Sequence, residues 1–179
     1  MLSRSSFICT ILTVVFAIPA AAQHDGPDSK YPAIVSGPIT AHAAVEIRDE
    51  DDKPIALKPE EKIAVMFLEA ISDLEDDCSH HLHRVCSMAD LVKGVQNPGW
   101  NIGHLTHDPA TDPNYTYTVT ANGTGWEATA LPNHPGLGAF FYNCRLISLK
   151  RYYNPSGPAT AHSIPFANVS IRGERFKKR

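Results

Sequence analysis

The feature that most constrains the fold is a change in hydrophobic period along the chain. Between residue 59 and about residue 77, apolar side chains recur at spacings of three, four and one, which places them on one helical face. Further along, Tyr115, Tyr117 and Val119 alternate with threonines, which is typical of a strand with one buried face. The helical stripe consists of Ile63, Met66, Phe67, Ala70, Ile71 and Leu74.

Four strands are predicted after this helix. Segments 115–119 and 126–130 flank Asn122-Gly123-Thr124-Gly125, which favours a hairpin turn. Segments 137–142 and 146–153 follow, bounded by turns that contain Pro and Gly. The sequence therefore predicts an α+β fold, in which an N-terminal amphipathic helix packs on an antiparallel sheet of about four strands.

The first 22 residues have the pattern of a secretory signal peptide. Arg4 precedes an apolar run over residues 8–18, and residues 20–22 are all Ala. The run is shorter than the ~20 apolar residues that a spanning helix needs. We therefore expect cleavage before Gln23 and an exported protein, either periplasmic, secreted or at the cell surface, with no membrane span after cleavage.

Composition divides the rest of the chain into three predicted parts. Residues 23–58 are expected to form a flexible leader with a short strand at 44–48, because Pro, Gly and Asp are frequent there. Residues 59–158 form the predicted globular domain, and residues 159–179 a C-terminal extension with a basic tail. The formal net charge of -3 leaves no general basic field, so nucleic acid is not an expected partner.

Three cysteines remain after the expected cleavage, in a compartment that permits disulfides. Cys78 and Cys86 are close in sequence and bracket a polar loop, which makes them the preferred pair. Pairing of either residue with Cys144 is the alternative, and the sequence leaves it open.

Three histidines between the first two cysteines are candidate metal ligands. His80, His81 and His83 carry imidazole groups, which bind zinc or copper when neutral. Adjacent histidines point in different directions, however, and their charge can instead offset the acidic end of the helix over residues 73–77. A metal site on these three residues is therefore the second hypothesis.

No catalytic pattern is found in the chain. Cys144 needs a neighbouring His to act as a nucleophile, and a lone cysteine in a strand is more often a small buried apolar residue. The sequence therefore predicts a protein that is not an enzyme, with no catalytic residues and no cofactor.

The order of these elements resembles the globular head of type IV pilins and type II secretion pseudopilins. The resemblance covers about residues 59–158, and it implies an exported, non-catalytic structural or protein-interaction module. Its implied partners are proteins or cell surfaces, including pilus or secretion components. The long N-terminal helix of polymerising pilins is absent, because the expected mature start at residues 23–27 is polar. The resemblance is carried by segments 115–119, 123–125 and 126–130, by Pro132, Pro135, Gly136 and Gly138, and by Phe140 and Phe141.

Overall fold

The structure, a computed structural model, describes residues 44–97, 100–146 and 148–172. The chain divides into two units, Met1–Pro32 and Ala33–Arg179, and every described residue belongs to the second. The predicted signal peptide and residues 23–43 of the predicted leader lie outside the described residues. No helix among the described residues has both the length and the apolar character needed to cross a bilayer.

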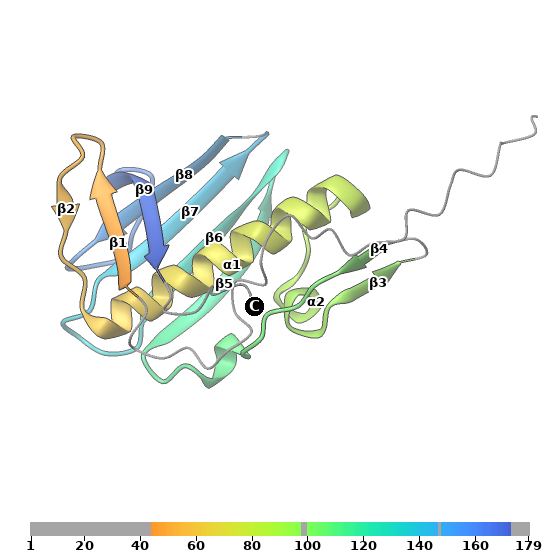
Figure 1. Ribbon diagram of the computed structural model, residues 1–179, viewed down its shortest axis with the longest axis horizontal. Helices are drawn as coiled ribbons and strands as arrows, with labels where there is room; N and C mark the ends of the chain where they lie inside the picture. The colour runs from red at the N-terminus through yellow and green to blue at the C-terminus, as the bar shows by residue number, and fades with distance from the viewer. Residues whose placement is uncertain (1–43, 98–99, 147, 173–179) are drawn as a thin grey trace, which may run out of the picture. The chain divides into compact units, whose positions relative to one another are not determined.

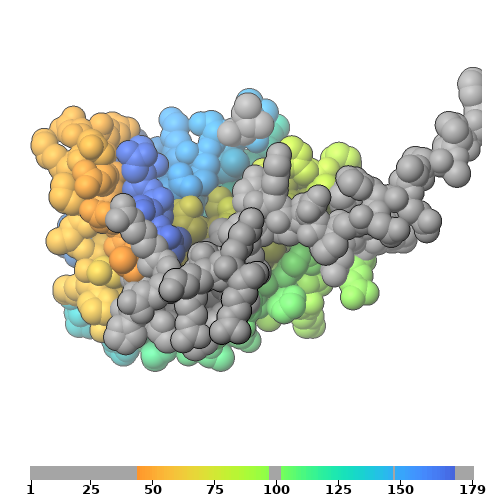
Figure 2. Space-filling model, in the orientation of Figure 1, coloured from red at the N-terminus to blue at the C-terminus, as the bar shows by residue number. Residues whose placement is uncertain are grey.

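A seven-stranded antiparallel sheet forms the body of the described chain (Figure 1). Its strand order is β2-β1-β9-β8-β7-β6-β5. Figure 2 shows the surfaces of β1 and β9 side by side, as expected from their pairing. The strands are β1 (Ala44–Asp49), β2 (Pro54–Ile55), β5 (Tyr115–Asn122), β6 (Gly125–Pro132), β7 (Ala139–Arg145), β8 (Ser148–Asn154) and β9 (Ile164–Arg172).

One long helix, α1 (Pro59–Leu82), crosses one face of this sheet (Figure 1). Pro59 suits the first helical position, where no intrahelical N–H bond is lost. The helix continues past the predicted residue 77 and ends at His83, whose φ of 52° is left-handed.

A second helix, α2 (Met88–Lys93), is short and capped at both ends. The Ser87 hydroxyl accepts the Asp90 N–H and the Asp90 carboxylate accepts the Ser87 N–H, which is a capping box. Gly94 ends the helix. The chain then forms β3 (Val95–Asn97), β4 (Trp100–Ile102) and the 3-10 turn η1 (Pro109–Thr111) before β5 begins.

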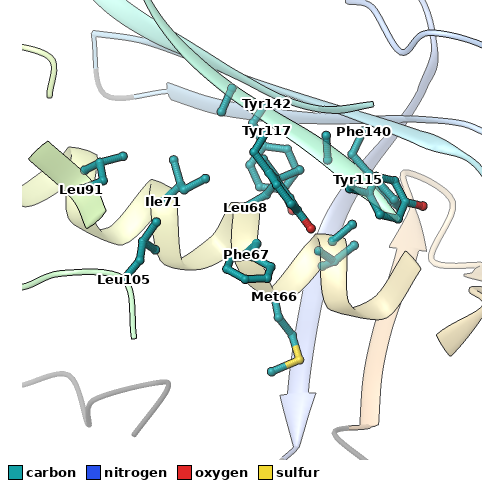
Figure 3. Packing of buried hydrophobic residues seen from close by; sticks show 14 of the residues in the cluster. Met66, Phe67, Leu68, Ile71, Leu91, Leu105, Tyr115, Tyr117, Phe140 and Tyr142 are labelled. Atoms are coloured by element: carbon teal, nitrogen blue, oxygen red, sulfur yellow. The ribbon is translucent and has the colours of Figure 1, made fainter. Parts of the chain in front are cut away.

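The apolar stripe of α1 packs on an aromatic face of the sheet (Figure 3). The rings of Phe67 and Tyr117 lie 5.0 Å apart, and Ile71 is fully buried. Phe140 is also fully buried and touches the rings of Tyr115, Tyr153 and Phe166. The apolar side chains of the predicted helix and those of the predicted strands therefore pack together in one core.

The predicted fold class is wrong in two respects. The long helix is not N-terminal, because β1 and β2 precede it, and the sheet has seven strands rather than about four. The reason is that β1, within the predicted leader, buries Val45 and Ile47, while β9, within the predicted C-terminal extension, buries Phe166. The fold is mostly β with one long helix in mid-chain, not the pilin-head architecture that the resemblance implied.

Candidate functional site

The candidate site is a polar cleft in the sheet between β8 and β9, called here the β8–β9 cleft. Its volume is about 420 Å3, within the range of roughly 300 to 1,000 Å3 typical of small-ligand sites. Four strand or helix segments contribute to it, from β1, α1, β8 and β9. The lining residues are Glu46, Arg48, Glu69, Arg151, Ala167, Asn168, Val169 and Ser170.

The cleft exists because β9 leaves β8 part-way along its length. The two strands pair only from Tyr153–Ile164 to Arg151–Phe166. On its other side, β9 pairs Phe166 with Asp49 and Asn168 with Arg48, so Ala167 is an extra residue in the ladder. Such a β-bulge bends its strand and increases the local twist, which accounts for the separation of β9 from β8.

The cleft exposes the edge of β9 rather than one of its faces. Residues of a strand point alternately to opposite faces, yet four consecutive residues, 167–170, line the cleft. Pairing with β1 occupies the far side of β9. The side toward β8 therefore offers backbone N–H and C=O groups that no ladder partner in β8 takes up.

A partly buried ion pair lies where the cleft meets α1. The Nε and Nη2 groups of Arg151 donate to Glu69 Oε1 and Oε2 at 2.7 and 2.9 Å. Tyr142 Oη donates to the same Oε1 at 2.7 Å, and the Arg151 guanidinium lies 5.5 Å from the centre of the Tyr142 ring. The side chains of Arg151 and Glu69 are only 19% and 15% exposed.

The electrostatics of this ion pair favour a permanent charge on Arg151. Burial acts to lower the pKa of Arg151, but hydrogen bonding to Glu69 and the charge of that carboxylate outweigh it and raise the pKa above its ordinary value. Burial, with the charge of Glu69, raises the pKa of Tyr142 well above its ordinary value, so the phenol stays a donor. Glu69 therefore accepts three hydrogen bonds and is held in one orientation.

A second, more exposed group of charges surrounds Arg48, which lines the cleft from β1. Arg48 contacts Glu46 at 3.3 Å and Asp52 at 3.5 Å, and its side chain is 37% exposed. Exposed pairs of this kind contribute little to stability. The formal charges of the two arginines and two glutamates that line the cleft sum to zero. The cleft thus offers hydrogen-bond donors and acceptors to a ligand without a strong net charge.

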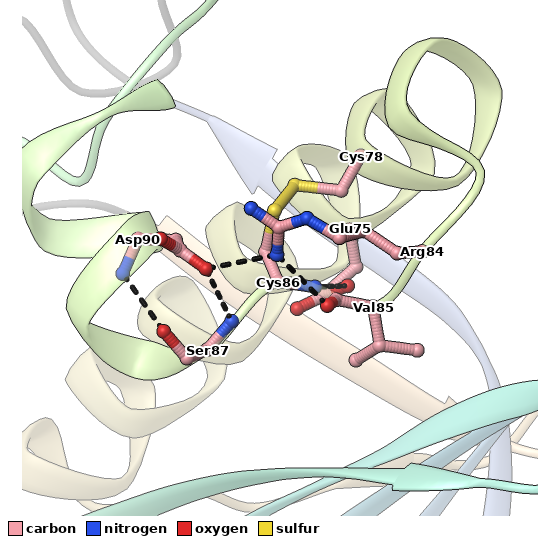
Figure 4. The surroundings of a disulfide bond; sticks show 7 residues. All are labelled: Glu75, Cys78, Arg84, Val85, Cys86, Ser87 and Asp90. Atoms are coloured by element: carbon pink, nitrogen blue, oxygen red, sulfur yellow. Dashed lines mark hydrogen bonds and ion pairs between the residues drawn. A yellow bond between two sulfur atoms is a disulfide. The ribbon is translucent and has the colours of Figure 1, made fainter. Parts of the chain in front are cut away.

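The preferred disulfide is present between Cys78, in the last turns of α1, and Cys86, just before α2 (Figure 4). Its S–S distance is 2.03 Å, and Cys144 is free. The bridge brings the backbone N–H of Cys86 to 3.1 Å from Glu75 Oε2. The disulfide therefore positions the donor that pairs with a buried carboxyl group of α1.

Glu75 is a buried acid that is not among the site residues predicted from the sequence. Its side chain is fully buried, and Oε1 has no hydrogen-bond partner among the described residues. Burial raises the pKa of Glu75 to about 7, although the Cys86 N–H and the charge of Arg84 act to lower it. Arg84 itself pairs with Asp90 at 2.9 Å (Figure 4).

The three candidate metal ligands do not converge. His80 and His81 lie in the last turns of α1, and His83 caps its end. His80 Nε2 lies 3.6 Å from Asp76, which agrees with the alternative that these imidazoles offset the acidic end of the helix. Among the described residues, no three His, Cys, Asp or Glu side chains form a group that could hold a metal ion. The metal hypothesis stays a prediction, and the described geometry adds no support to it.

Cys144 lies on β7, half-buried, opposite Trp126 of β6. Burial, with a smaller contribution from Asp76, raises the pKa of its thiol. Because the thiolate is the nucleophilic form, this environment disfavours a reactive cysteine.

The cleft is not predicted from the sequence, because no strand is predicted after residue 158. A signal was present in residues 164–171, where Ile164 and Phe166, and then Val169 and Ile171, recur at a spacing of two. The spacing of three between Phe166 and Val169 breaks the period of two, and it coincides with the bulge at Ala167. Arg151 and Glu69 gave no such signal, since their pairing depends on the tertiary fold.

Comparison of the chain with protein-family models, with curated proteins and with solved structures finds no match. The pilin resemblance therefore gains no support from these comparisons.

Replacing Cys78 and Cys86 together with Ala is expected to lower the free energy of unfolding by about 2 to 3 kcal/mol, because the bridge closes a short loop and restrains the unfolded chain. Denaturant unfolding of the double variant measures the loss. The matched control is Cys144→Ala, which removes a thiol without removing a bridge. An equal loss in both variants would mean that packing of the sulfur atoms, not the bridge, supplies the stability.

Proposed function

We propose that this protein is an exported, non-catalytic protein-interaction module, and that the β8–β9 cleft binds an extended peptide segment of its partner. The observation that supports this proposal most directly is the exposed edge of β9 over residues 167–170. An extended peptide can pair with such an edge through its own backbone, as in β-strand addition.

The charges of the cleft fit a peptide better than a charged metabolite. The formal charges of the lining side chains cancel, and a peptide backbone is neutral but rich in donors and acceptors. The volume of about 420 Å3 accommodates a few residues of extended chain.

The state of the ionisable groups favours binding over catalysis. Glu69 is fixed by three hydrogen bonds from Arg151 and Tyr142, so it serves to orient these groups. The same ion pair gives the site a rigid wall, which reduces the entropy lost on binding.

The test uses a neutral probe, N-acetyl-trialanine amide, titrated into the isotopically labelled protein. We expect saturable changes in the backbone amide NMR signals of residues 167–170. Ala167→Trp should abolish them, because Ala167 is an exposed lining residue and the indole would fill the cleft. Ala161→Trp is the matched control, since Ala161 is also exposed but lies outside the cleft.

If the amide signals of residues 167–170 do not change on addition of the probe, the proposal is contradicted. Equal responses in the two tryptophan variants would also contradict it, because binding would then lie elsewhere.

A further inference from the structure

The two ends of the sheet differ in how they are protected against pairing with another chain. At one end, β2 has only two residues, begins with Pro54 and follows the charged residues Asp52 and Lys53. Shortness, proline and charge are the usual means by which an edge strand avoids association. At the other end, β5 has none of these features.

The β5 edge is long and regular. All eight residues from Tyr115 to Asn122 pair with β6 in one unbroken register, without a bulge. Among the described strands, β6 is the only one that pairs with β5. Since every second residue of an antiparallel strand turns its N–H and C=O away from its partner, half of the β5 residues direct backbone groups outward.

We propose that β5 pairs antiparallel with β5 of a second copy of this chain, joining the two sheets across a two-fold axis. The strand contains no Lys, Arg, Asp or Glu, so two copies can approach without like-charge repulsion. Residues Thr116, Thr118 and Thr120 point to the same exposed face, and two-fold pairing places threonines opposite threonines.

The contact that this arrangement needs already occurs once inside the sheet. Thr118 of β5 and Thr129 of β6 lie directly opposite each other, with their hydroxyl oxygens 2.6 Å apart. A second β5 would meet Thr118 from the other side with the same chemistry. The dimer leaves the β8–β9 cleft free, since β7 and β6 separate that cleft from β5.

Sedimentation of the purified full chain over a range of concentrations tests the proposal. We expect reversible dimers in the wild type. Thr118→Lys should raise the dimer dissociation constant by at least about tenfold, because two lysines would then lie opposite or close to each other at the new pairing. Thr129→Lys is the matched control, since it loses the same hydroxyl contact and adds the same charge one strand further inside.

A dimer that persists in Thr118→Lys but not in Thr129→Lys would overturn the proposal, as would equal weakening in both variants. A wild type that stays monomeric at every concentration would overturn it as well. Circular dichroism of each variant shows whether the sheet is retained, so that a loss of folding is not mistaken for a loss of pairing.

Discussion

Phe140→Ala is expected to lower the free energy of unfolding by about 3 to 5 kcal/mol, the loss typical of a buried phenylalanine that leaves a cavity. Phe140 is fully buried, and its ring centroid lies 5.0 Å from that of Tyr153 and 6.4 Å from those of Tyr115 and Phe166. These three rings come from β8, β5 and β9, so the cavity would open at a point where several strands meet beneath α1.

The matched control is Phe141→Ala, at the next position of the same strand. Phe141 points to the opposite face of the sheet, where it is half-buried and stacks on Tyr152 at 5.9 Å. Its removal should cost much less, since solvent already reaches the site. Denaturant unfolding of both variants gives the comparison, and similar losses would mean that the two faces of the sheet are equally covered.

The second large effect concerns Glu75 and pH. Burial raises the pKa of Glu75 from 4.5 to about 7 in the folded protein. A raised pKa in the folded state means that folding favours the protonated form of Glu75. The stability that the protonated side chain contributes is therefore complete below pH 4.5 and is lost as the pH rises through 7. A shift of this size corresponds to about 3 kcal/mol.

Glu75→Gln should remove this dependence, because the amide has the shape of the protonated acid and does not titrate. We expect the variant to resemble the wild type near pH 4 and to be more stable by up to about 3 kcal/mol near pH 8, where the wild type carries a buried charge. The side-chain oxygen of the introduced glutamine can still accept the Cys86 N–H. Unfolding measured across this pH range supplies the test.

The control for Glu75→Gln has to change the total charge without disturbing the charged groups around Glu75. Arg84 lies near it and opposes the shift, while Asp90 adds to it. Glu50→Gln, in the exposed turn after β1, changes the total charge equally without touching this cluster. Parallel pH profiles for the wild type and Glu75→Gln would contradict the assignment of the titration to Glu75.

The sequence predicts local structure well where the pattern is long or the turn is specific. The helix that begins at residue 59 and the hairpin around Gly123 both depend on neighbouring residues, and both are present. The preference for Cys78 and Cys86 as the disulfide pair is confirmed for the same reason.

The sequence predicts the sheet poorly where the partner of a strand is distant. The short strand expected at 44–48 is present as β1, yet nothing in its pattern indicates that its partner is β9. The Glu69–Arg151 pair joins α1 to β8 and depends on the same long-range arrangement. The candidate site is therefore a product of topology, and only the bulge at Ala167 leaves a local trace in the sequence.

The pairing of β1 with β9 also sets when the chain can finish folding. Val45 pairs with Ile171, so this ladder carries a larger loop-closure entropy than the hairpins β5 to β8, which form between close neighbours. During synthesis β1 emerges early, and it cannot form its ladder with β9 until that strand emerges late in the chain. Until then β1 can pair only with the two-residue strand β2, which leaves the β9 side of β1 open. Chains truncated before β9 should therefore be aggregation-prone intermediates rather than smaller stable domains.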